Sequence, residues 1–78
     1  MSEYGLGLKL REMYDNAPKG ELVMHIHLFG IKYADEIKDN RYSVKEIVKS
    51  AELQESYHAE VSKGIKLAKY VEMKRTSL

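Results

Sequence analysis

Apolar residues recur every three or four positions along most of this 78-residue chain. That spacing places them on one face of an amphipathic helix. Pro18 ends the first such helix, because proline has no amide hydrogen to donate and disfavours a helical backbone at the residue before it. The spacing therefore predicts a helix over residues 6–17 and favours a helical fold for the chain. The apolar face of this first helix consists of Leu6, Leu10, Met13, Tyr14 and Ala17.

The segment after this proline can be interpreted in two ways. Residues 22–28 alternate between apolar and other side chains, as a β-strand would. A helix over 21–38 is favoured, because an apolar stripe at helical spacing continues from Val23 to Ile37 and the chain has no second clear strand for pairing. Gly30 lies inside this helix, where glycine costs about 1 kcal/mol relative to alanine. The sequence leaves open a kink or a break at this glycine.

A capping box marks the start of the next helix. The Ser43 hydroxyl is expected to accept a hydrogen bond from the amide of Glu46, and the Glu46 carboxylate to return one to the serine amide. The helix that follows is short, over 44–51, because Glu52–Leu53 interrupts it. A longer helix is expected from Gln54 to about Val71, on the spacing of its apolar residues.

Together these segments predict an all-α fold, a compact bundle of four or five helices forming one domain over residues 1–78. A chain of this length has room for a single core. Its 44% of hydrophobic and 32% of charged residues suit a folded globule with a solvated surface. The side chains expected in the core are those of Val23, Ile26, Tyr33, Ile37, Ile47, Val48, Leu53, Tyr57, Val61 and Ala68.

The short helix, the turn and the long helix after it resemble a helix-turn-helix unit over about 43–71. In such units a three- or four-residue turn joins two helices that cross at a steep angle. Leu53 is expected to pack into that angle. Helix-turn-helix turns usually begin with glycine, but this chain has Glu52 there, so a different turn geometry is expected.

Three segments are similar to a group of small, uncharacterised bacterial proteins described as helix-turn-helix-like. These segments are His27–Asp35, Glu52–Tyr57 and Lys63–Val71. The resemblance implies the fold. It implies DNA binding only by analogy with other proteins that share the fold.

If the unit binds double-stranded DNA, the outward residues at the start of its second helix would face the duplex. Gln54 and Ser56 are candidates for hydrogen bonds to base edges, and Lys63 for a phosphate contact. Other lysines would position the protein on the DNA backbone. The candidate DNA-binding residues are Gln54, Ser56, Lys63, Lys45, Lys49 and Lys66.

The charge distribution supports this interpretation only in part. The net charge is +1, but residues 1–40 hold five Lys/Arg against seven Asp/Glu, whereas residues 41–78 hold eight against five. An anionic partner is therefore expected to bind the second half. Glu55 and Glu60 lie near the same surface and would repel phosphate. The alternative function is a protein-interaction module or a homodimer that uses the same fold without DNA.

Other classes of function have no support in the sequence. The chain has no cysteine, and His25 and His27 would point about 200° apart on a helix, so neither a metal site nor a cofactor is expected. No catalytic motif is present, so we expect a protein that is not an enzyme. No stretch approaches the ~20 apolar residues of a membrane span, which favours a cytoplasmic protein with no membrane partner.

Overall fold

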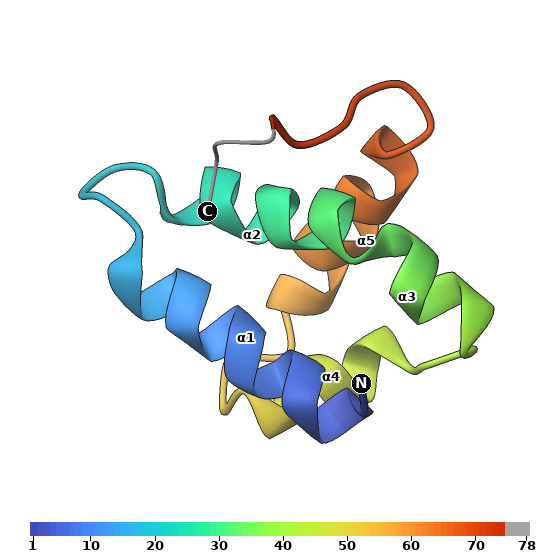
Figure 1. Cartoon of the computed structure of the whole chain (residues 1–78). Coiled ribbons are helices and arrows are strands. Elements are labelled where there is room, and N and C mark those ends of the chain that lie inside the picture. The colour runs from blue at the N-terminus through green and yellow to red at the C-terminus, as the bar shows by residue number, and fades with distance from the viewer. Residues whose placement is uncertain (75–78) are drawn as a thin grey trace.

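The structure is a computed structural model, and it describes residues 1–74. These residues form five α-helices and no strand, within an envelope of 25 × 25 × 20 Å (Figure 1). The predicted all-α bundle of four or five helices is confirmed. The helices are α1 (Glu3–Asn16), α2 (Leu22–Lys32), α3 (Ala34–Asp39), α4 (Val44–Ser50) and α5 (Tyr57–Leu67).

Helix α1 begins three residues earlier than its apolar spacing indicates. The Ser2 hydroxyl accepts a hydrogen bond from the Gly5 amide at 2.9 Å and caps the helix. Gly5 and Gly7 are therefore helical. The helix ends at Asn16, one residue before its predicted end and two residues before Pro18.

The segment over 21–38 is helical, but it is interrupted at Tyr33 and not at Gly30. The backbone of Tyr33 has φ −108° and ψ 14°, which separates α2 from α3. Gly30 is fully inside α2 and buried. The kink or break that the sequence leaves open at this glycine does not occur, because α2 continues through it to Lys32.

The five helices form two crossing pairs, α2 with α5 and α1 with α4, and α3 connects one pair to the other (Figure 1). In the α2/α5 pair the backbones meet at two glycines. A Cβ atom added to Gly64 would lie 2.3 Å from the carbonyl oxygen of His27, and one added to Gly30 would lie 2.5 Å from that of Val61. Only glycine permits helices to approach this closely.

The α1/α4 pair has glycine on one side only. A Cβ atom added to Gly7 would lie 2.6 Å from the Cβ atom of Ser50 in α4. Side chains of α1 also contact both ends of α4. Glu3 Oε2 accepts a hydrogen bond from the Ser43 amide at 2.6 Å, and Arg11 Nη1 donates to the carbonyl oxygen of Ala51 at 3.4 Å.

The predicted capping box of α4 is confirmed in one of its two bonds. The Ser43 hydroxyl accepts from the Glu46 amide at 3.2 Å. The prediction that the Glu46 carboxylate accepts a hydrogen bond from the Ser43 amide is wrong. The carboxylate of Glu3, from α1, accepts the Ser43 amide hydrogen instead, so a tertiary contact replaces a local one.

The core contains half of the side chains predicted for it. Tyr33, Leu53, Tyr57 and Ala68 are only partly buried. The prediction that Val23 is a core residue is wrong, since 45% of its surface is exposed. It lies one turn before the part of α2 that packs on α5. The spacing of apolar residues in α1 correctly predicted that Leu6 and Leu10 face the core. The burial of Phe29 was not predicted. The fully or almost fully buried side chains are Leu6, Leu10, Ile26, Phe29, Ala34, Ile37, Ile47, Val48, Ala51 and Val61.

Candidate nucleic-acid interface

The end of α4 is closed by a left-handed residue. The Glu52 amide donates to the carbonyl oxygen of Lys49 at 3.0 Å, and the Leu53 amide to that of Val48 at 3.2 Å, which is the pattern of a Schellman motif. Glu52 has φ 58°. The prediction of a different turn geometry is wrong, because this glutamate adopts the backbone conformation that glycine usually supplies.

Leu53 directs the chain away from α4. Its side chain is partly buried and packs against the core, as expected for the leucine of the turn. The second helix, however, begins at Tyr57 and not at Gln54. The amides of Tyr57 and His58 donate to the carbonyl oxygens of Gln54 and Glu55, both at 3.0 Å. These i to i+3 bonds form turns, so the connection between α4 and α5 spans six residues, 51–56.

Gln54 and Ser56 therefore lie in the connection and not in a helix. Both are exposed, so nothing in the bundle blocks them. Their prediction as the outward residues of a helix start is wrong. The reason is that the Tyr57 and His58 amides bond to the third residue before them and not to the fourth, so residues 54–56 form turns and the α-helix begins after them.

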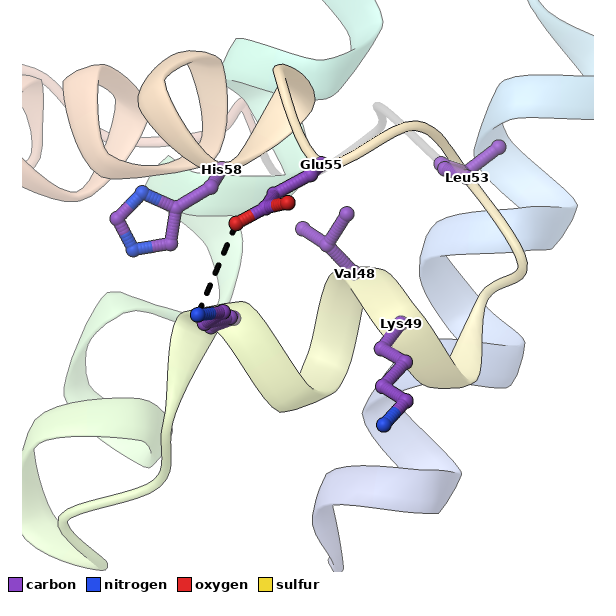
Figure 2. Close-up of a pocket in the computed structure, with 6 residues that line it drawn as sticks. Val48, Lys49, Leu53, Glu55 and His58 are labelled. Atoms are coloured by element: carbon purple, nitrogen blue, oxygen red, sulfur yellow. Dashed lines mark ion pairs between the residues drawn. The ribbon is translucent and has the colours of Figure 1, made fainter.

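A hollow separates α4 from the start of α5 (Figure 2). Val48 and Leu53 supply its apolar lining, and Lys45 Nζ lies 3.7 Å from Glu55 Oε1 across its mouth. The side chains of this ion pair are 68% and 79% exposed, so the pair contributes little to stability. In Figure 2 the amino group of Lys49 lies on the other side of α4, away from Glu55.

The lysines of α5 lie elsewhere. Lys63 and Lys66 line a shallow hollow with His27 of α2 and with Leu67 and Tyr70. The six candidate residues therefore do not form one surface. Lys45, Lys49 and Ser56 lie around the start of α5, and the two α5 lysines lie on the side of that helix next to α2.

The carboxylate of Glu60 in α5 lies against α2. Glu60 Oε1 lies 2.7 Å from His27 Nε2, and Glu60 Oε2 lies 3.4 Å from Lys63 Nζ. The hydrogen bond with His27 holds the pKa of the Glu60 carboxyl below its usual range, and Lys63 contributes in the same direction. Because Lys63 already has an anionic neighbour, it is less available for phosphate.

Two cations that the sequence interpretation left out also bear on the site. Arg11 donates to the carbonyl oxygens of Ala51 and Glu52, both at 3.4 Å, and so holds the left-handed turn. Arg41, between α3 and α4, is exposed and has φ 55°. A glycine at position 41 or 52 would have indicated a left-handed turn from the sequence, but these positions hold Arg41 and Glu52.

The described part of the chain offers no metal site. Within residues 1–74 no group of three or more His, Cys, Asp or Glu side chains is close enough to hold a metal ion. His25 lies 3.6 Å from Glu21 and His27 pairs with Glu60, on different sides of α2. Nor does any helix in that part combine the length and the apolar character needed to cross a membrane.

Comparison with known proteins identifies the family. Searches of curated proteins and of solved structures found no match. A family model described as "HTH-like domain" matches residues 2–74. That match covers all five helices, and the chain therefore belongs to the helix-turn-helix-like domain family.

Proposed function

We propose that the protein binds double-stranded DNA as a small, non-enzymatic regulator. The observation that carries the proposal is the exposure of Lys45 and Lys49 in α4 and of Lys63 and Lys66 in α5, in a domain of the helix-turn-helix-like family. Lysine side chains neutralise phosphates and release condensed counterions. Such contacts supply affinity and position the protein, whatever the base sequence.

The net charge of +1 requires binding to depend on local and not global charge. Two of the four lysines have carboxylate neighbours, at 3.7 Å for Lys45 and 3.4 Å for Lys63. The side chains of Lys45 and Glu55 are 68% and 79% exposed, so a phosphate can replace this carboxylate at small cost, whereas Glu60 beside Lys63 is also held by His27. We therefore expect moderate affinity that is strongly sensitive to salt.

The experiment is a titration of a fluorescent duplex with the full chain, followed by anisotropy at several salt concentrations. Three or four phosphate contacts predict a slope of about −3 for the logarithm of the association constant against the logarithm of salt concentration. The first half, with five Lys/Arg against seven Asp/Glu, offers a control, because charge reversal at Lys9 in α1 should leave the slope unchanged. Absence of salt-dependent binding to any duplex, including a randomised pool, would refute the proposal.

One observation favours a second function, a protein-interaction module or homodimer. Leu67 and Tyr70 are 41% and 83% exposed and line one hollow with His27. Exposed apolar clusters of this kind mark contact surfaces. A wild-type dimer in analytical ultracentrifugation that Leu67→Ser with Tyr70→Ser converts to a monomer would support this alternative, and a wild-type monomer at all concentrations would not.

A further inference from the structure

Residues 34–67 contain two consecutive helix-turn-helix arrangements, and α4 belongs to both. In the first, residues 40–43 join α3 to α4. In the second, residues 51–56 join α4 to α5. Helix-turn-helix units have turns of three or four residues. The first connection, with four residues, meets that length, and the second, with six, exceeds it.

The first turn also has an ordered backbone. The Arg41 amide donates to the carbonyl oxygen of Lys38 at 3.1 Å, and the Tyr42 amide to that of Ile37 at 3.0 Å. With φ 55° at Arg41, this is a second Schellman motif, and it turns the chain sharply at the end of α3. Tyr42 then packs against the core, and Ser43 caps α4 at once. The turn therefore fixes α4 relative to α3.

Cations follow this arrangement on its exposed side. Lys38, Arg41, Lys45 and Lys49 are all exposed and are spaced three or four residues apart. The backbone positions of Lys45 and Lys49 lie one helical turn apart on α4. The Lys45 amino group pairs with Glu55, and that of Lys49 points away from Glu55 (Figure 2). The buried Ile47 lies on the opposite face of α4, and the buried Val48 lies between that face and the lysines. In Figure 1 the α3–α4 connection lies at the outer edge of the molecule.

The corresponding face of α5 is less suited to a polyanion. One of its lysines, Lys63, lies beside Glu60, which His27 also contacts. Glu60 cannot move away without losing its 2.7 Å contact to α2. Glu55, which pairs with Lys45 of α4, has no comparable restraint, because its side chain is 79% exposed.

We propose that α4 and the turn before it form the DNA-contacting element, with the side chains of Arg41, Lys45 and Lys49 on phosphates. This inference rests on the proposed function and replaces α5 by α4 as the helix that lies against the duplex. The side chains make these contacts, and Glu46, exposed between the two lysines, is the residue of α4 placed to accept a hydrogen bond from a cytosine amine.

The test compares matched charge reversals by duplex anisotropy at one salt concentration and across a salt series. Lys49→Glu is expected to weaken binding about tenfold and to reduce the salt slope by about 1. Lys66→Glu, the same change at an exposed lysine of α5, is expected to weaken binding less than Lys49→Glu. Lys9→Glu, at an exposed lysine of α1, is the control and is expected to alter affinity less than about twofold. Arg41→Gln should resemble Lys49→Glu in direction.

A variant that is expected to bind the duplex more tightly distinguishes a change in DNA contacts from a loss of folding. Glu55→Gln removes the carboxylate beside Lys45, so it should strengthen duplex binding about threefold. If Lys66→Glu or Lys63→Glu weakens binding more than Lys49→Glu and Glu55→Gln gives no gain, the assignment to α4 is overturned while DNA binding stands. If the wild-type chain shows no salt-dependent binding, the proposed function itself fails, and this inference fails with it.

Discussion

In the α2/α5 pair a glycine lies on each side of the contact, whereas in the α1/α4 pair Gly7 faces the side chain of a serine. The atoms that an added methyl group would meet are backbone atoms of His27 and Val61 in the first pair. In the second pair the nearest atom is the Cβ of Ser50. A backbone contact inside two helices cannot yield without moving a helix, but a side-chain contact can be relieved by one substitution.

The two pairs also differ in their polar contacts. Helix α1 contacts both ends of α4, through Glu3 at Ser43 and Arg11 at Ala51. Helices α2 and α5 are joined along their sides, by His27 and Glu60. Close packing therefore determines the position of α5, while side chains of α1 hold α4 at its ends. The proposed DNA contacts on α4 therefore come from the pair whose closest contact involves a side chain.

The largest expected effect comes from Gly64→Ala. Its methyl group would lie 2.3 Å from the carbonyl oxygen of His27, so α2 and α5 must separate, and the core between them loses contacts. We expect a loss of about 3 kcal/mol in the free energy of unfolding, measured by urea denaturation. Gly30→Ala should behave in the same way, with its added Cβ 2.5 Å from a backbone oxygen.

Gly5→Ala is the control for this substitution. It places the same methyl group in α1, where the nearest atoms belong to the side chains of Met1 and Ser2. A change within about 1 kcal/mol, in the stabilising direction, is expected from helix propensity alone. If Gly64→Ala were tolerated as well as Gly5→Ala, the backbone contact would not be what holds the pair.

These glycines also show how far the fold could be predicted from sequence. The helical segments could be predicted, because the apolar period of 3.6 residues is local information. The pairing of the helices could not. Gly7 and Gly30 have the appearance of weak points in a helix, a loose start and a break, yet both are buried contact sites. A glycine that relaxes a backbone and one that admits a neighbouring helix are identical in sequence.

The candidate site was predictable to a similar extent. The start of α4 at Ser43 followed from a local capping pattern and is confirmed. The left-handed turns were missed, since Arg41 and Glu52 have no intrinsic preference for positive φ and adopt it because the flanking helices and the core require it. That omission also moved the predicted start of the last helix from Tyr57 to Gln54.

A smaller effect is expected in the other pair, from Gly7→Ala. Its methyl group would lie 2.6 Å from the Cβ of Ser50 and 3.1 Å from the carbonyl oxygen of Ile47. We expect a loss of about 2 kcal/mol by urea denaturation. Adding Ser50→Gly should recover about half of that loss in a double-mutant cycle, because the closest atom is removed.

The cycle sharpens the comparison between the pairs. Gly64→Ala has no equivalent rescue, because its closest neighbour is a backbone oxygen that no substitution removes. Additive effects of Gly7→Ala and Ser50→Gly would show that α1 and α4 do not meet as closely as the structure indicates.

The polar contact at the start of α4 should contribute less. Glu3→Ala removes the acceptor of the 2.6 Å bond from the Ser43 amide. An exposed, charge-assisted hydrogen bond of this kind contributes about 1 kcal/mol, so we expect a destabilisation of that size. Amide hydrogen exchange should be faster at the start of α4 than in the wild type. Glu12→Ala, an exposed change on the same helix, should leave exchange in α4 unaltered.

The smallest effect concerns the side-chain contact between α2 and α5 and is seen through pH. The folded-state pKa of Glu60 lies below the ordinary glutamate value of 4.5, mainly because of the hydrogen bond with His27. A lowered carboxyl pKa adds stability above the unfolded-state pKa, and this stability is lost as pH falls through the folded-state pKa. Glu60→Gln should therefore lower the urea midpoint at pH 7, and the difference in midpoint from wild type should disappear below pH 4.5.

Glu55→Gln is the control. It lies at a largely exposed ion pair and should leave the midpoint unchanged at both pH values. If the difference in urea midpoint between Glu60→Gln and wild type were as large at acid pH as at pH 7, the contribution of Glu60 to the α2/α5 contact would come from packing and not from its charge.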